Sequence, residues 1–151
     1  MRRTIISDAS CFIVLSKIDS IELLHSVYGT IITTPEIAAE FGEPLPNWVT
    51  IENVKNIHKQ QLLELNVDKG EASAIALALD TPNSTIILDD YKARKVAQTL
   101  GLKITGTIGV IVKAKLDGII PSIKPLINSI KRTNFRITPE LELQSLIAAK
   151  E

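Results

Sequence analysis

The stretch Thr85-Ile86-Ile87-Leu88-Asp89-Asp90-Tyr91-Lys92 decides the fold, because a short apolar run ends here in two adjacent carboxylates. The three apolar residues are consecutive and branched, and they follow the turn Thr81-Pro82-Asn83-Ser84. They predict a strand buried on both faces, with the carboxylates at its carboxyl end. In open parallel α/β sheets, that edge binds ligands. Capping of a helix expected over 92–100 explains one aspartate well, but it does not readily explain both.

Length and composition favour one soluble domain. A chain of 151 residues with 45% hydrophobic residues is typical of a single domain, here 1–151, that buries a proper core. No stretch approaches the roughly 20 apolar residues of a membrane span, and the start Met1-Arg2-Arg3-Thr4 leads into a strand rather than a signal peptide. The single Cys11 excludes an internal disulfide. We therefore expect a cytoplasmic protein with no membrane partner.

The formal net charge of zero conceals a strong division along the chain. Residues 1–90 carry six basic and thirteen acidic side chains, whereas residues 91–136 carry ten basic side chains and one acid. One explanation is chance clustering of surface lysines. The alternative is an acidic site that faces a basic surface, which would suit a polyanion handled through metal ions.

Strand and helix patterns alternate along the chain, which predicts an α/β fold with a mostly parallel sheet of about four to five strands. Thr34-Pro35 and Thr138-Pro139 each predict a helix start, with threonine as cap and proline in the first turn. C-terminal helices are expected from about 121, where Pro121 starts the first of them. The strands are expected near 4–7, 30–33, 48–51, 86–88 and 101–105.

Acidic residues recur near the expected strand ends and helix starts. A parallel sheet gathers its strand ends on one edge, so carboxylates far apart in the sequence should meet there. Such carboxylates repel each other unless they are protonated or share a bound cation. Oxygen ligands without histidine or thiolate favour Mg²⁺ or Mn²⁺ over zinc. The candidate catalytic and metal-binding residues are Asp8, Glu40, Glu71, Asp89 and Asp90.

Glu71 also has a structural explanation. Asp68 and Glu71 fit a capping box, in which the aspartate caps the helix and the glutamate reaches back to it. Gly70, a poor helix former at the helix entrance, argues against a purely structural role for this segment. Both roles for Glu71 therefore remain open at this point.

Five segments in a fixed order resemble the PIN domain family, in particular its small prokaryotic VapC-like members. Each segment alone is short, whereas the ordered set is fairly specific and covers about residues 4–115. The resemblance implies a three-layer α/β/α fold around the parallel sheet. The segments are Ile6-Ser7-Asp8-Ala9-Ser10, Thr34-Pro35-Glu36-Ile37-Ala38-Ala39-Glu40-Phe41, Lys69-Gly70-Glu71-Ala72-Ser73-Ala74-Ile75-Ala76, Ile87-Leu88-Asp89-Asp90 and Gly106-Thr107-Ile108-Gly109.

The resemblance also implies roles for individual residues. Asp8 would be a primary metal ligand, with Ser10 supporting the site from the same turn. Glu40 would hold the position of the family's helix glutamate, and Glu71 would stand where many members have aspartate. One aspartate after the fourth strand would be a ligand. The motif leaves open which one, with a slight preference for Asp90 and with Asp89 as a cap or a supporting residue. Thr107 resembles the family's small hydroxyl residue beside the acids.

By this resemblance the chain is a metal-dependent endoribonuclease with Mg²⁺ or Mn²⁺ as cofactor and RNA as substrate. It also suggests the toxin of a type II toxin-antitoxin pair, a homodimer and a small antitoxin partner whose basic group enters the acidic pocket. Basic residues after the acidic pair would follow the RNA backbone, and their contribution should weaken with salt. The candidates for this contact are Lys92, Arg94, Lys95, Lys113, Lys131 and Arg132.

Two other classes of function compete with a nuclease. The first is a catalytically silent PIN-like module that binds nucleic acid or protein. The second is a phosphotransfer domain with a doubly wound fold, since such domains also place aspartates at strand ends. Asp8-Ala9-Ser10 lacks the second aspartate of the phosphatase motif, and the acidic pair comes late in the chain, which makes the second class the weaker one.

Overall fold

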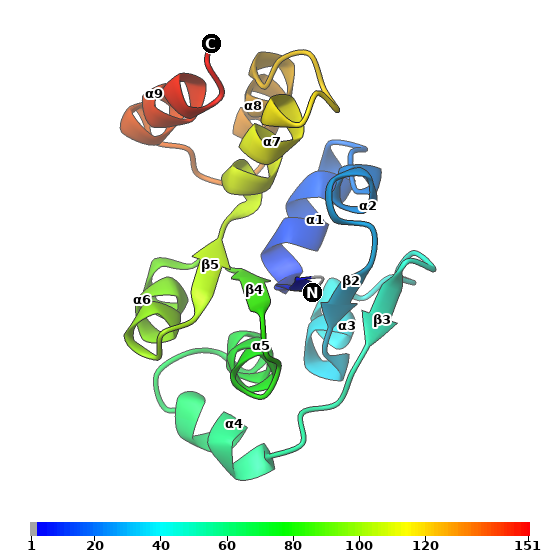
Figure 1. The fold of residues 1–151 in the computed structure, drawn as a ribbon, viewed down its shortest axis with the longest axis vertical. Coiled ribbons are helices and arrows are strands. Elements are labelled where there is room, and N and C mark those ends of the chain that lie inside the picture. Colours follow the sequence, from blue (N-terminus) through cyan, green and yellow to red (C-terminus); the bar gives the residue numbers. More distant parts are fainter. Residues whose placement is uncertain (1–2) are drawn as a thin grey trace.

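A parallel β-sheet forms the centre of the protein, seen in a computed structural model that describes residues 3–151 (Figure 1). The sheet has five strands in the order β3-β2-β1-β4-β5, and every neighbouring pair within the described residues is parallel. The predicted α/β fold with a sheet of four to five strands is therefore confirmed. The strands are β1 (Thr4–Ser7), β2 (Ile31–Thr33), β3 (Val49–Ile51), β4 (Ser84–Ile87) and β5 (Lys103–Thr105).

Helices cover the sheet on both sides and give the three-layer α/β/α arrangement. In Figure 1, α1, α2 and α7 lie above the strands and α5 lies below them, while α8 and α9 pack beyond α7. The helices are α1 (Ala9–Lys17), α2 (Glu22–Tyr28), α3 (Pro35–Phe41), α4 (Ile57–Leu63), α5 (Lys69–Leu79), α6 (Tyr91–Thr99), α7 (Thr107–Leu116), α8 (Lys124–Lys131) and α9 (Pro139–Ala148).

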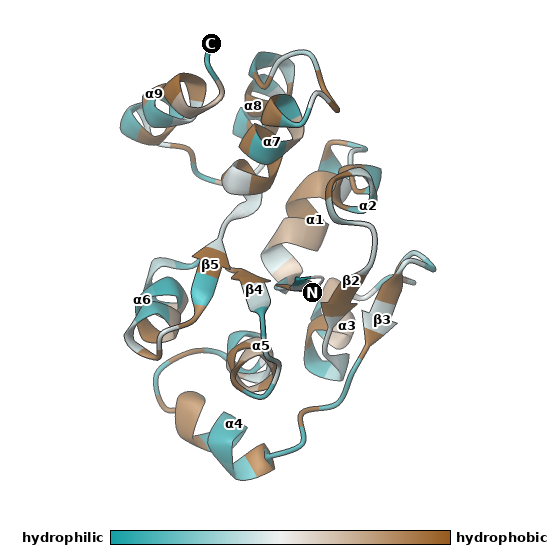
Figure 2. Cartoon of the chain, in the orientation of Figure 1, coloured by the Kyte–Doolittle hydropathy of each residue, from teal (hydrophilic) through white to brown (hydrophobic). Residues whose placement is uncertain are grey.

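The central strands are buried on both faces, as the apolar run predicts. Ile86, Ile87 and Leu88 are fully buried, although the strand itself ends at Ile87. In Figure 2 the strand β2 and the end of β4 are mainly brown, whereas the outer helix α6 carries much teal. Burial from both sides requires continuous apolar sequence, and a parallel sheet between two helical layers provides that environment.

Helix α5 packs closely against the sheet because its small side chains allow it to. Ala72, Ala74, Ala76 and Ala78 are all buried, and the helix contacts β1 and β4 as well as the helices α3, α4 and α6. A helix buried on several sides needs small or apolar residues around most of its circumference. The closeness of α5 to β1 brings its N-terminus to the same edge of the sheet as Asp8.

The register of the sheet places the acidic segments side by side. Ser7 pairs with Ile87, and Ile87 also pairs with Thr105 on the other side. The chain therefore leaves β1, β4 and β5 at one level, with the next residues of all three strands at the same edge. The amide of Asp8 donates to the Ile87 carbonyl at 3.0 Å, which extends this alignment beyond the strand itself.

The helix predicted to start at Pro121 starts later, at Lys124. The segment before it is held as a turn, because Ile123 is fully buried and its amide donates to Glu151 Oε2 at 2.8 Å. Pro125 takes the place of the proline in the first helical turn. Among the described residues, no helix has both the length and the apolar character required to cross a membrane.

Gly109 allows α7 to pack directly against the end of β5. A Cβ atom on Gly109 would collide with Thr105 Oγ1. We predict that Gly109→Ala lowers the free energy of unfolding by about 1–2 kcal/mol, because the clash outweighs the better helix propensity of alanine. Urea denaturation should show that Thr105→Ala restores most of this loss in the double variant. Equal effects of Gly109→Ala in both backgrounds would contradict this packing.

Candidate functional site

Asp8 is buried at the point where β1 becomes α1. It caps α1, with Oδ1 accepting from the Cys11 amide at 2.9 Å, and its Oδ2 accepts from the Asp89 amide at 3.0 Å. Burial, followed by the negative charge of Asp89, raises the pKa of Asp8 well above its usual range. The two amide donors work in the opposite direction but do not compensate fully. The charged form of Asp8 is thus solvated incompletely by the protein.

Asp89 faces Asp8 and is held by the start of α7. Its Oδ1 accepts from the Thr107 amide at 2.7 Å, and its Oδ2 accepts from Thr107 Oγ1 at 2.6 Å. A Cβ atom on Gly106 would lie 3.0 Å from Asp89 Oδ1, so the carboxylate uses the space that a glycine leaves open. Thr107 is fully buried and fixes both oxygens of Asp89. This contact agrees with the predicted supporting position of Thr107 beside the acids.

Asp90 is the residue that caps α6, with its Oδ2 accepting from the Ala93 amide at 3.0 Å. Of the two aspartates, Asp90 and not Asp89 is therefore the cap, because α6 begins at Tyr91 and the residue directly before a helix takes the capping position. The carboxylate of Asp89 is instead held by Thr107, its amide donates to Asp8, and its negative charge raises the pKa of Asp8. This geometry favours Asp89 as the closer partner of Asp8, while Asp90 lines the same acidic cavity.

The two glutamates approach this edge from α3 and α5. Asp68 and Glu71 form the predicted capping box, with the Glu71 amide donating to Asp68 at 2.8 Å and Glu71 Oε1 accepting from the Asp68 amide at 3.3 Å. Burial and the charges of Asp68 and Asp90 raise the pKa of Glu71 to about 7. Burial, with Asp68, also raises the pKa of Glu40. Glu71 is therefore both a cap and a member of the acidic cluster.

Two cavities join these side chains. The smaller, of about 40 Å³, is lined by Asp8, Ser10, Glu40, Asp68 and Glu71 among others. The larger, of about 470 Å³, shares Ser10, Glu40 and Glu71 with it and adds Asp89 and Asp90. The structure thus brings together the five predicted acids, the predicted support Ser10 and, through Asp89, Thr107.

Sequence reasoning did not place Asp68 or Arg136 at these cavities. Asp68 was expected only as a helix cap, yet it lines the small cavity and raises the pKa of both glutamates. Arg136 lies in the segment before α9 and lines the larger acidic cavity. The position of Asp68 close to Gly70 in the sequence indicates that Asp68 can lie near the acids. No local pattern indicates that the chain brings residue 136 back to the edge of the sheet.

The predicted basic residues do not all gather at one place. Lys92, Arg94 and Lys95 lie on α6, Lys113 lies on α7, and Lys131 and Arg132 lie at the end of α8. Helices α6 and α8 stand well apart in Figure 1. Lys113 forms an ion pair with Asp117 at 3.1 Å, and Lys131 pairs with Glu142. Of the six, only Arg94 lines one of the cavities that reach Asp89.

The donor chemistry at Asp8 and Asp89 fits a hard divalent cation. Within residues 3–151, neither carboxylate has a basic partner at ion-pair distance, although Asp8 is almost fully buried. The described residues contain no group of three histidine, cysteine, aspartate or glutamate side chains close enough to hold a metal ion by themselves. Mg²⁺ commonly binds through one or two carboxylates and keeps several waters. The pair therefore fits a hard divalent cation better than a metal that requires a complete protein cage.

A parallel α/β/α sandwich with acidic side chains at the carboxyl edge of its sheet has the architecture of a nuclease-type fold. A family model described as a PIN domain matches residues 4–151. The chain belongs to the PIN domain family. Proteins of this family are generally nucleases that use divalent metal ions. Searches of curated proteins and of solved structures yield no match to this chain.

Asp89→Asn should stabilise the protein in the absence of divalent metal. The amide can accept from the Thr107 amide and donate to its hydroxyl, so both contacts are kept while the repulsion with Asp8 is removed. We expect the melting temperature in EDTA at pH 8 to rise by about 2–4 °C for each ~1 kcal/mol gained. The gain should shrink as the pH falls and Asp8 takes up a proton in both proteins.

The sign follows from the raised folded-state pKa of Asp8. The stability linked to this group is fully present below its unfolded value and is lost as the pH rises through the folded value. Scanning calorimetry at several pH values measures the effect. A variant that melts below the parent at pH 8 would rule out repulsion between the two carboxylates as a source of instability.

Gly70→Ala should displace Glu40 without destabilising the fold. A Cβ atom here would lie 2.9 Å from Glu40 Oε1, which is the mobile end of a side chain. Alanine favours the helix by up to about 1 kcal/mol, so urea denaturation should show equal or greater stability. A crystal structure of the variant should show the Glu40 carboxylate moved out of the small cavity. Lys69→Ala on the exposed neighbouring position is the control, and an unmoved Glu40 would contradict the prediction.

Proposed function

We propose that this PIN domain protein is a metal-dependent endoribonuclease that hydrolyses phosphodiester bonds of RNA. The proposal rests on one observation, the neighbouring carboxylates of the buried Asp8 and the half-buried Asp89 at the carboxyl edge of the sheet, which have no basic partner at ion-pair distance within residues 3–151. Such a pair is costly to the fold unless it serves a cation. The membership of the chain in the PIN domain family supports the same conclusion.

Asp8 and Asp89 are the residues that would hold Mg²⁺ or Mn²⁺. When bound, the ion supplies positive charge for a phosphate oxygen and lowers the pKa of a coordinated water. The protein's own contribution is orientation. Amides of Cys11 and Asp89 fix the two oxygens of Asp8, and Thr107 fixes those of Asp89. Both carboxylates therefore hold their positions before any ligand arrives.

Glu40, Glu71 and Asp90 extend the negative surface from this pair into the larger cavity. Lys17 and Arg136 line the same cavity. These cations supply positive charge for a phosphate that binds in the cavity. We therefore expect RNA binding to weaken as the salt concentration rises. Contacts between these cations and phosphates release counterions, and the free energy gained from that release is smaller at high salt.

The two alternative functions differ in what supports them. The match to the PIN domain family favours a nuclease or a silent PIN-like module over the phosphotransfer class. Titration with Mn²⁺ separates the first two. Heat from Mn²⁺ binding that disappears in Asp89→Asn supports the metal site, whereas RNA binding without any Mn²⁺ heat at millimolar metal supports the silent module.

The toxin role, the small antitoxin and the homodimer stay predictions based on the family resemblance, and the cytoplasmic location stays a prediction based on composition. The acidic cavity beside Ser10 is the place where a basic group of an antitoxin would enter. Co-expression with the product of a neighbouring gene for a short DNA-binding protein, followed by size-exclusion chromatography, examines the partner and the oligomeric state together.

Asp8→Asn and Asp89→Asn should each reduce Mn²⁺-dependent cleavage of a fluorescent single-stranded RNA by on the order of 100-fold or more, because each removes a charged ligand of the ion. EDTA should abolish cleavage by the parent protein. The control is Asp117→Asn, which removes an exposed acid paired with Lys113 on α7 and should cleave normally. Full metal-dependent cleavage by Asp8→Asn would refute the proposed function.

A further inference from the structure

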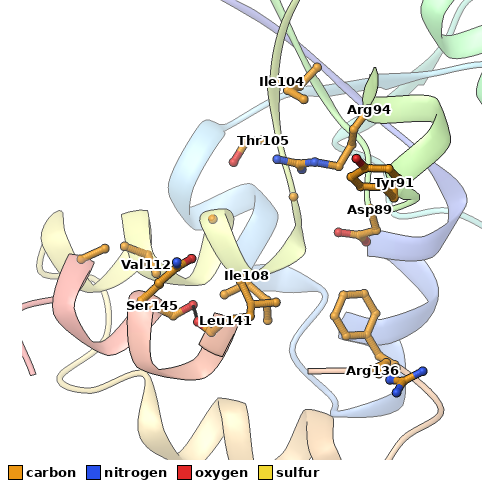
Figure 3. A pocket seen from close by; sticks show the side chains of 15 residues that line it. Asp89, Tyr91, Arg94, Ile104, Thr105, Ile108, Val112, Arg136, Leu141 and Ser145 are labelled. Carbon is orange, nitrogen blue, oxygen red and sulfur yellow. Dashed lines mark hydrogen bonds between the residues drawn. The ribbon is translucent and has the colours of Figure 1, made fainter. Parts of the chain in front are cut away.

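A cavity of about 550 Å³ opens beside the acidic cluster (Figure 3). It lies between the start of α6, the end of β5 and the facing helices α7 and α9. Figure 3 shows Asp89 between Arg94 and Arg136 on one side, with Val112, Leu141 and Ser145 on the other. A volume of this size is typical of sites for small molecules or single nucleotides.

This cavity is continuous in its lining with the acidic one. Asp89, Phe135 and Arg136 belong to both. A polymer whose phosphate lies at Asp89 would therefore have its neighbouring unit at the mouth of the second cavity. Asp89, which we place at the metal site, thus also lines this second cavity.

The walls combine flat apolar surface with a few polar groups. Ile104, Ile108 and Val112 provide aliphatic surface, and the ring of Tyr91 stands at the rim with 73% of its surface exposed. Gln144 is exposed, and its Nε2 donates to Glu140 Oε1 over a long distance of 3.4 Å. A nucleobase has matching chemistry, because its faces stack on apolar or aromatic groups and its edges take hydrogen bonds.

Two cations at the rim favour an anionic ligand over a purely apolar one. Within residues 3–151, neither Arg94 nor Arg136 forms an ion pair. Arg94 is fixed in position because its Nη1 donates to the Leu88 carbonyl at 2.8 Å. Arginine beside apolar surface is a common arrangement for binding a phosphate that carries a base.

We propose that this cavity binds the nucleobase next to the scissile phosphate, which requires that base to be unpaired. The inference rests on the proposed function and adds a position for the substrate. A paired base could not leave its helix for the cavity without breaking its pairing and stacking. Arg136, shared by both cavities, holds the phosphate on the side of the acids.

Filling the cavity tests the proposal. Ala148 is exposed on α9 and lines the cavity, so Ala148→Trp would occupy it from the surface. Ile147 is the next residue on the same helix, with 66% of its surface exposed and no place in the lining, so Ile147→Trp is the matched control. Both changes are made in the Asp8→Asn background, and binding of a labelled eight-nucleotide RNA is measured by fluorescence anisotropy in EDTA.

We expect Ala148→Trp to weaken binding of the single-stranded RNA at least tenfold relative to the Ile147→Trp control. An abasic site at one position should weaken binding to the Ile147→Trp protein but not to Ala148→Trp. A duplex of the same sequence should bind at least tenfold more weakly than the single strand. Equal affinity of the two tryptophan variants, equal affinity for the duplex, or no RNA binding at all would overturn the proposal.

Because binding is measured without metal, the result is separate from the proposed function. Pocket-dependent binding together with no Mn²⁺-dependent cleavage by the parent would reject the nuclease and keep the base-binding cavity. Cleavage by the parent with equal RNA affinity of the two tryptophan variants would reject the cavity and keep the nuclease. Arg136→Ala should also make the affinity for RNA depend less steeply on salt concentration, by about the amount expected for the loss of one phosphate contact.

Discussion

The hydrogen bond from the Asp89 amide to Asp8 Oδ2 joins the ends of the two central strands, and the rest of the site depends on it. It forms because Ser7 and Ile87 are paired in the sheet, so that the following residues leave the strands at one level. A shift of one residue in that register would turn each aspartate to another face. The buried apolar residues of β1 and β4 hold the register and therefore also position the carboxylates.

The acidic edge of the sheet contributes less to the stability of the fold than uncharged residues would contribute at the same positions. Burial and mutual repulsion raise the pKa of Asp8, Glu40 and Glu71, and neither Asp8 nor Asp89 has a basic partner among the described residues. Gly70 and Gly106 leave space that carboxylates use in place of Cβ atoms. These features make sense together if the edge is built for a cation and an anionic substrate, because such a ligand supplies the missing compensation.

Sequence reasoning reached the sheet and the five acids because each depends on local patterns. Consecutive apolar residues mark doubly buried strands, and carboxylates directly after them must lie at the sheet edge. It could not assign the capping role between Asp89 and Asp90, since a shift of one residue in the start of α6 exchanges the two. Arg136 and the start of α8 depend on contacts such as that of Glu151 with Ile123, which join residues far apart in the chain.

A crystal soaked in Mn²⁺ and measured for anomalous scattering tests most directly whether Asp8 and Asp89 share a divalent cation. The geometry predicts a peak within coordination distance of both carboxylates, and no such peak in crystals of Asp89→Asn treated in the same way. Two results would contradict the metal site and the nuclease function that depends on it. In the first, manganese binds only at other acidic residues. In the second, the soaked crystals show no anomalous peak between these two side chains although manganese has entered the lattice.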